Sequence, residues 1–144
     1  LGDVYKRQIN AFGEELMVEN AENAISAAQI KCKCQVSEFT AAPVYLTNTS
    51  KGRHEWAIEF AREPASLEEF SIVLDDELKK CNSDYEAKRH GDLALLLPIV
   101  NKCKEGTFYN WLKAKQKLGG QHKVPKLCNE RKILEEILKI DKNE

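Results

Sequence analysis

The sequence predicts an α+β domain, a two-layer sandwich in which helices cover a small, mostly antiparallel sheet. Three observations support this fold class. Two strand-like stretches flank a turn cluster, helical periodicity recurs before and after them, and the two kinds of segment interleave irregularly. Of the 144 residues, 42% are hydrophobic and 31% are charged, which is typical of a single globular domain.

The first eight residues are expected to be foreign to the protein. Read back into codons, LGDVYKRQ fits one frame of a widely used transposase sequencing adapter, although a native polar terminus could spell the same peptide. We therefore expect residues 1–8 to be an adapter scar, which is excluded from the fold. Residues 9–144 are then expected to be a C-terminal fragment of a longer protein.

The first native segments predict a helix capped by an asparagine. Residues 9–12 form a short apolar stub. Asn20 is expected to cap a helix over residues 21–30, because an asparagine side chain can accept a hydrogen bond from a free N–H at a helix start. Helical spacing places four apolar side chains on one face: Ala21, Ala24, Ile25 and Ala28.

A β-hairpin is predicted next. Residues 34–47 are rich in β-branched and aromatic types, and Pro43 is expected at an edge or a bulge, because proline has no N–H for the strand ladder. Turn-forming residues follow at 48–52, and residues 54–60 then alternate as a second strand that pairs with the first. The alternation puts one set of side chains on the same face: Trp56, Ile58 and Phe60.

Two helices are predicted after the hairpin. Ser66 and Glu69 have the spacing of a capping box, which marks the start of a helix. Its apolar stripe consists of Leu67, Phe70, Leu74, Leu78 and Cys81. Ser83 or Asp84 is expected to cap a short helix that ends at Arg89.

The last third of the chain predicts a buried strand and two more helices. Residues 93–100 form a near-continuous apolar run with Pro98 inside it, which is typical of a buried strand. Thr107 is expected to cap a helix that ends at a diglycine, and Asn129 is expected to cap the last helix. Their inward side chains are expected to be Phe108, Trp111 and Leu112, and then Ile133, Leu134, Ile137 and Leu138.

Charge and cysteine content narrow the functional classes. With 22 basic and 23 acidic residues, the net charge of −1 gives no electrostatic reason to expect nucleic acid or an anionic membrane as a partner. The five cysteines are odd in number and irregularly spaced, which favours buried thiols in a reducing, cytoplasmic compartment over a disulfide framework. A zinc site seeded by Cys32 and Cys34 is the sharper alternative, but their spacing is tighter than in zinc knuckles, so no metal is expected.

Two segments could carry chemistry. Gly13 precedes paired carboxylates at the mouth of a helix, an arrangement that is also common in simple capping. The second segment runs from the diglycine to a proline and could swing Lys123 to a phosphate as a movable point charge, although an ordinary exposed loop would have the same composition. From these residues alone, both interpretations stay open for each segment.

Four ordered segments resemble the C-terminal domain of the auxin-responsive acyl-acid amido synthetase family, in its bacterial branch. They are residues 9–16 (INAFGEEL), 52–60 (GRHEWAIEF), 82–89 (NSDYEAKR) and a late stretch from GTFYNWL at 106–112 to GGQHKVPK at 119–126. The resemblance extends over nearly all of the chain after the scar. It implies a mobile cap whose partner is a large N-terminal domain that binds ATP and the acid.

The family is similar to the acyl-adenylate-forming superfamily. The resemblance implies a parent enzyme that uses ATP and Mg²⁺ to convert a carboxylic acid into an acyl-adenylate and pyrophosphate. The acyl group then passes to an amine such as an amino acid. The fragment alone is expected to be inactive and to bind no cofactor, because the ATP and acid pockets belong to the other domain.

The resemblance also implies roles for particular residues. Residues 13–16 match the segment just after the hinge between the two domains. Lys123 matches a lysine before a proline in the late loop, and it would stabilise charge that builds on the α-phosphate as the carboxylate attacks. Residues implied to face the nucleotide or acyl-adenylate are Gly13, Glu14, Gly119, Gly120, Gln121 and His122. Plant members carry a lysine near the hinge segment where this chain has another residue, so more than one cap lysine is a candidate.

A different class of function is compatible with the same fold. A small α+β sandwich can be a free-standing regulatory module that binds a metabolite or another protein, since fold does not determine function. That hypothesis expects a start codon close upstream of Ile9, whereas the enzyme hypothesis expects several hundred upstream residues with a phosphate-binding loop. A cap domain is also expected to expose a less polar face than a free domain, with both candidate segments near it.

Overall fold

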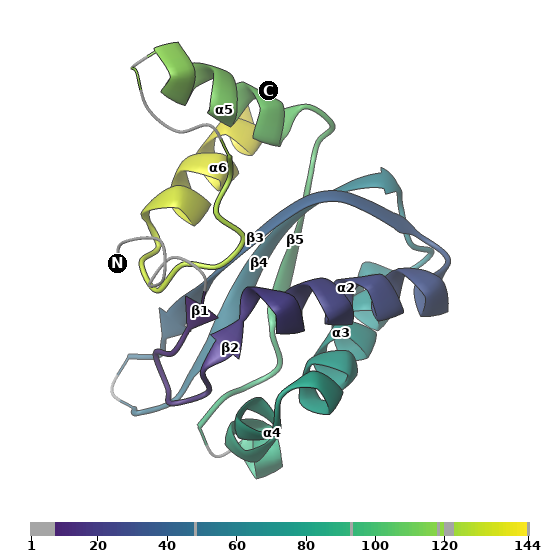
Figure 1. The fold of residues 1–144 in the computed structure, drawn as a ribbon, viewed down its shortest axis with the longest axis vertical. Coiled ribbons are helices and arrows are strands. Elements are labelled where there is room, and N and C mark those ends of the chain that lie inside the picture. The colour runs from purple at the N-terminus through teal and green to yellow at the C-terminus, as the bar shows by residue number, and fades with distance from the viewer. Residues whose placement is uncertain (1–7, 48, 93, 118, 120–122, 144) are drawn as a thin grey trace.

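The computed structural model describes residues 8–47, 49–92, 94–117, 119 and 123–143. Its central sheet has the strand order β3-β4-β5, in which β3 (Gln35–Tyr45) and β4 (Gly52–Arg62) are antiparallel (Figure 1). Strand β5 (Ile99–Cys103) pairs with β4 in parallel. Two short antiparallel strands, β1 (Gln8–Ile9) and β2 (Leu16–Met17), form a separate hairpin. The predicted α+β fold with a small, mostly antiparallel sheet is confirmed.

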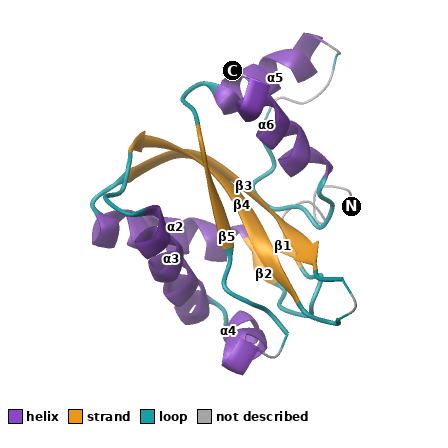
Figure 2. Ribbon diagram, turned by 180° about the vertical axis from the view of Figure 1, so that it is seen from behind, coloured by secondary structure: helices purple, strands orange, loops and turns teal. Residues whose placement is uncertain are grey.

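The helices divide into two groups. Helices α2 (Val18–Cys32), α3 (Leu67–Cys81) and α4 (Ser83–Arg89) lie together, whereas α5 (Thr107–Lys117) and α6 (Lys132–Asn143) lie at the other end of the molecule (Figures 1 and 2). Each group has its own apolar core. Because successive strand residues point to opposite faces, each face of the central sheet packs against one of these cores.

The first core joins α2 and α3 to one face of the sheet. The face predicted for α2 is confirmed, since Ala21, Ala24, Ile25 and Ala28 are buried. Trp56, Ile58 and Phe60 of β4 also face this core, as predicted. Phe60 meets Phe70 of α3 edge to face, with ring centroids 5.2 Å apart. Such aromatic pairs contribute about 0.5–1.5 kcal/mol beyond the area they bury.

Of the predicted helix caps, the one at Ser66 is correct. Its side chain accepts a hydrogen bond from the Glu69 N–H at 3.1 Å, which satisfies one of the free donors at the start of α3. The prediction for α4 is wrong by one residue. Asn82 has an extended backbone and caps that helix instead of Ser83 or Asp84, accepting from the Tyr85 N–H at 2.7 Å.

Two other predicted caps are wrong because the asparagines serve different contacts. Asn20 lies inside α2, and its side chain accepts from the Met17 N–H at 2.9 Å, one residue before the helix. Asn129 precedes α6 by three residues, and its side chain accepts from the Asn10 N–H at 2.8 Å. Asn129 therefore ties the end of β1 to the segment before α6 rather than capping the last helix.

The third strand lies later in the chain than predicted. Strand β5 begins at Ile99, directly after Pro98, because proline cannot donate a ladder hydrogen bond. Before it, Leu95 makes an isolated bridge to Gly52, while Leu93 lies outside the described residues. Helices α3 and α4 form the crossover between β4 and β5, which is the connection that parallel strands require.

Gly52 lies where three backbone segments meet. Its N–H donates to Ala94 O, and its carbonyl accepts from the Leu96 N–H, both at 2.9 Å. A Cβ at Gly52 would lie 2.1 Å from Phe12 Cζ and 2.4 Å from Val44 O. Any larger residue would therefore displace the turn between β1 and β2 from the start of β4.

The second core holds α5 and α6 on the sheet. Phe108 and Trp111 are buried as predicted, and so are Leu134 and Ile137, while Leu112, Ile133 and Leu138 pack against them half-buried. Helix α5 is followed by Gly119 at φ +74°, a conformation that favours glycine. The predicted partner in the diglycine, Gly120, lies outside the described residues.

The cysteines and the apolar character of the helices were two further features of the sequence analysis. None of the five cysteines forms a disulfide; Cys32, Cys34, Cys103 and Cys128 are buried and Cys81 is half-buried. Burial raises the pKa of Cys103 to about 12. Within the described part of the chain, no helix combines the length and the apolar character needed to cross a membrane.

Candidate functional site

The turn between β1 and β2 directs Glu14 into the domain. The residue is 0% exposed, and its Oε2 lies 2.6 Å from Nε2 of His54 on β4, whose side chain is equally buried. The other carboxylate oxygen, Oε1, accepts from the Phe12 N–H at 2.7 Å. Glu14 thereby joins its own turn to the start of β4, and its predicted place facing the nucleotide stays a prediction.

Gly13 lies at the exposed tip of this turn. Its φ of +83° belongs to the left-handed region, which glycine adopts without steric cost. Asn10 holds both sides of the tip, because its carbonyl accepts from the Gly13 N–H at 3.4 Å and its side chain accepts from the Glu15 N–H at 3.0 Å. The turn is therefore fixed by local hydrogen bonds on its outer side and by Glu14 on its inner side.

A buried polar chain continues inward from Glu14. The ring of His54 lies beside that of Tyr85, with centroids 5.6 Å apart. The Tyr85 hydroxyl donates to Oδ1 of Asp75 at 2.7 Å, and Arg89 donates to both oxygens of Asp75 at 2.8 Å. We call these five residues the Glu14–Arg89 chain. It links the β1–β2 turn to β4, α3 and α4.

The electrostatics of this chain follow from burial and pairing. Burial alone would raise the pKa of Asp75, but hydrogen bonds from Arg89 and Tyr85 outweigh it and hold that pKa below its ordinary value. Burial, reinforced by the neighbouring Asp75, raises the pKa of Tyr85 well above its ordinary value. Asp75 is therefore a carboxylate and Tyr85 a neutral donor at neutral pH.

Replacing Asp75 with asparagine is expected to destabilise the domain in a pH-dependent way. A carboxyl whose folded pKa is lowered contributes stability above its unfolded pKa of 3.8, and that contribution is lost as the pH falls through the folded value. Near pH 6, Asp75→Asn should cost about 1.5–3 kcal/mol, the usual range for hydrogen bonds to a charged group. Urea unfolding between pH 6 and pH 3 measures this, and the difference from wild type should shrink below about pH 4. A cost that is constant over this range would show that the Asp75 charge contributes nothing.

The segment that carries Lys123 adjoins the second core, which α5 and α6 form with the sheet. Lys123 is exposed, while Val124 after it is buried with α5 and α6. The Pro125 carbonyl accepts from the Thr40 hydroxyl at 2.6 Å, so the backbone after Lys123 is anchored on β3. Gly120, Gln121 and His122, which were predicted to face the nucleotide, lie outside the described residues.

The structure does not link the described residues of the two predicted segments to each other. Among the described residues, no hydrogen bond or ion pair joins Gly13 or Glu14 to Gly119 or Lys123. The β1–β2 hairpin lies beside the lower ends of β3 and β4, whereas α5 lies at the top of the molecule (Figure 1). A face shared by both segments therefore stays a prediction.

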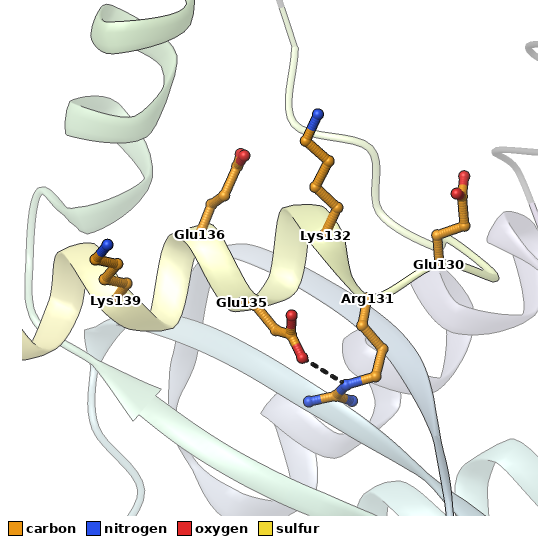
Figure 3. Close-up of a pocket in the computed structure, with 6 residues that line it drawn as sticks. All are labelled: Glu130, Arg131, Lys132, Glu135, Glu136 and Lys139. Carbon is orange, nitrogen blue, oxygen red and sulfur yellow. Dashed lines mark hydrogen bonds and ion pairs between the residues drawn. The ribbon is translucent and has the colours of Figure 1, made fainter.

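A shallow surface pocket of about 480 Å³ lies along α6 and contains none of the predicted site residues (Figure 3). It is lined by Glu130, Arg131, Lys132, Glu135, Glu136 and Lys139. Arg131 pairs with Glu135 and Glu55, and Glu136 accepts from Trp111 Nε1 and pairs with Lys115. Because these charges largely compensate one another, the pocket resembles an ion-paired helix surface more than a ligand site.

The Glu14–Arg89 chain includes candidate functional residues that the sequence patterns did not predict. His54, Asp75, Tyr85 and Arg89 come from three elements, and each lies in an otherwise ordinary strand or helix pattern. The spacing of Tyr85 and Arg89 by four residues, on one face of a short helix, was a usable signal. Their partner Asp75 could not be chosen from sequence among the many acidic residues of α3.

The α+β fold agrees with the class of domain that the four sequence segments indicated, the C-terminal domain of an acyl-acid amido synthetase. The model of the GH3 family C-terminal domain matches residues 19–132. The chain belongs to this family. The predicted family resemblance is thus confirmed, while the assignment to its bacterial branch stays a prediction.

Solved structures show the same fold. The chain is similar to a structure described as "GH3.15 acyl acid amido synthetase", with a TM-score of 0.73 and 17% identity over 95% of this chain and 24% of that chain. A second similar structure, "AtGH3.15 acyl acid amido synthetase in complex with 2,4-DB", has a TM-score of 0.70 and 14% identity, over 92% of this chain and 25% of that one. The chain thus spans about a quarter of the length of the proteins it matches. No curated protein sequence matches it.

Proposed function

We propose that this chain is the mobile C-terminal cap of an ATP-dependent acyl-acid amido synthetase-like enzyme. The observation that carries the proposal is the family match over residues 19–132, supported by the similar fold of a structure described as an acyl acid amido synthetase. The partner of the cap is a large N-terminal domain that holds ATP, Mg²⁺ and the acid. The chain alone is then inactive, and five cysteines without a disulfide fit a cytoplasmic enzyme.

The proposed reaction has two steps. A carboxylate oxygen of the acid attacks the α-phosphorus of ATP, the bond between the α- and β-phosphates breaks, and pyrophosphate leaves. The amine of a second substrate, such as an amino acid, then attacks the acyl carbonyl. The amide bond forms, AMP leaves, and the amine nitrogen loses a proton.

Lys123 is the residue we propose for the first step. Its side chain is exposed, so it is free to reach a nucleotide held by the other domain. The anchors that follow it, Val124 in the second core and Pro125 on β3, fix where the lysine-bearing loop ends. The ammonium is a compact point charge that can stabilise charge building on the α-phosphate. Gly119, Gly120, Gln121 and His122 are proposed to face the nucleotide or the acyl-adenylate beside it.

The β1–β2 turn is proposed to lie just after the hinge between the two domains. Glu14 joins the turn to β4, and Asn10 joins it to Asn129 before α6. A rotation before residue 9 would therefore move the turn and both cores as one body. In this arrangement Gly13 would face the acyl-adenylate, with Glu14 supporting the turn from inside.

Replacing Lys123 with alanine in the full-length parent is expected to lower acid-dependent ATP–pyrophosphate exchange. The loss should be about 2–4 kcal/mol of transition-state stabilisation, the range for one preorganised donor. That corresponds to a roughly 30- to 1,000-fold fall in rate. The matched control is Lys142→Ala, which removes another exposed lysine in the last turn of α6 and should leave the rate unchanged. Exchange at the wild-type rate in Lys123→Ala would remove this lysine from the mechanism.

A further inference from the structure

We infer that Lys88, together with the Gly13 turn, forms a second anion-binding point of the cap and binds the phosphate of the adenylate. This inference rests on the proposed function. Lys88 lies on α4 and is partly buried. A Cβ at Gly13 would lie 3.3 Å from Lys88 Cε and 3.4 Å from Nζ. The glycine thus leaves room for the lysine side chain to lie directly over the tip of the turn.

The ammonium of Lys88 has no partner among the residues that the structure describes. Within the described part of the chain, no hydrogen bond or ion pair reaches its Nζ, whereas the neighbouring Arg89 is held by Asp75 and Asp92. Glu14, the carboxylate beside Gly13, is directed away to His54. Exposed Glu15 makes no ion pair with any described residue, and its carbonyl accepts from the Asn82 side chain at 3.1 Å. The tip of the turn therefore presents a cation that no described side chain neutralises.

The backbone that carries Lys88 is held firmly. Its own carbonyl accepts from the N–H groups of Ala94 and Leu95, at 3.2 and 2.9 Å. On either side of it on α4, Tyr85 and Arg89 both bind Asp75 of α3. Only the lysine side chain is then left to adjust when an anion arrives, which keeps the entropic cost of binding low.

These features favour a phosphate group as the ligand. A lysine binds phosphate as a movable point charge, and it does not need the planar geometry that an arginine fork imposes on its partner. Arg89, the next residue on α4, has both its Nε and Nη2 committed to Asp75. Gly13 is exposed and has no side chain of its own, so a bulky tetrahedral group can approach its main chain closely beside the Lys88 ammonium.

Binding of AMP to the 144-residue chain tests the inference directly. In a titration followed by ¹⁵N–¹H NMR at low ionic strength, AMP should shift the amide signals of residues 11–15 and 86–91. Adenosine, which has no phosphate, should leave them in place. Lys88→Met should abolish the AMP-dependent shifts, and the control Lys142→Met should retain them. Shifts that persist in Lys88→Met, or no shift with AMP in the wild type, would overturn the inference.

The full-length parent separates failure of this inference from failure of the proposed function. If the parent catalyses acid-dependent ATP–pyrophosphate exchange, Lys88→Met should raise the KM for ATP or lower kcat by at least tenfold relative to Lys142→Met. If the parent is active and Lys88→Met and Lys142→Met have the same kinetic constants, the role of Lys88 is ruled out, while the proposed function is unaffected. A parent without exchange would instead count against the proposed function, while AMP binding by the chain would still report on Lys88.

Discussion

Replacing His54 with alanine is expected to lower the free energy of unfolding by about 3–5 kcal/mol, because breaking a buried pair leaves one partner uncompensated. The side chains of Glu14 and His54 are both 0% exposed, with 2.6 Å between Oε2 and Nε2. Without the imidazole, the Phe12 N–H would be the one partner that the described residues leave to the carboxylate of Glu14. Urea unfolding monitored by circular dichroism gives this free energy.

Two further variants make the result specific to the pair. Glu14→Gln retains the shape and one hydrogen-bonding oxygen, so it should cost less than His54→Ala. Replacing both residues with apolar ones, as Glu14→Leu with His54→Phe, should recover most of the loss, because a buried pair often gives way to packed side chains without net cost. If His54→Ala alone costs under about 1 kcal/mol, the pair does not hold the turn to β4.

Replacing Trp111 with alanine is the second change with a large expected effect, a loss of about 3–5 kcal/mol from an emptied core site. Trp111 is 2% exposed and packs in the second core with α6. Its Nε1 donates to Glu136 Oε1 at 2.9 Å, so the indole joins α5 to α6 by both packing and a hydrogen bond. The loop that carries Lys123 lies between these helices, so its position depends on this contact.

The effect of Trp111 can be separated from that of α5 as a whole. Tyr109 lies on the same helix with 65% of its surface exposed, and Tyr109→Ala should change stability by under about 0.5 kcal/mol. Trp111→Phe keeps most of the buried ring and loses only the hydrogen bond, so it should fall between the two. Amide hydrogen exchange should become faster across α5 and α6 in Trp111→Ala than in the wild type. Equal exchange rates in the two proteins would contradict the role of Trp111 in joining these helices.

Local patterns were sufficient to predict most of the fold. The buried face of α2, the β3–β4 hairpin and the start of α3 at Ser66 each follow from spacing within a dozen residues. The caps predicted at Asn20 and Asn129 failed because a side chain that can cap a helix can also accept from another backbone N–H, near or distant. Asn129 shows this most clearly, since its partner is Asn10, 119 residues away. The parallel pairing of β5 likewise depends on a crossover that no local pattern encodes.

Less of the candidate site than of the fold could be predicted from the sequence. Gly13 was chosen for its place before paired carboxylates, and the structure explains the choice through a positive φ. The partner of Glu14 is His54, 40 residues away, and nothing in the sequence distinguishes a buried acid from an exposed one. The role of Lys88 could not be predicted from the sequence either, because its proximity to Gly13 arises only when α4 packs beside the turn.

The central claim is that this chain is the cap of an enzyme that activates carboxylic acids with ATP. The most direct test measures ATP–pyrophosphate exchange by the full-length parent across a broad panel of acids, with residues 9–144 present and deleted. The account predicts exchange with at least one acid, and a fall of at least about 100-fold on deletion, comparable to losing the stabilisation supplied by one preorganised donor. No exchange with any acid, or exchange that persists without these residues, would contradict it.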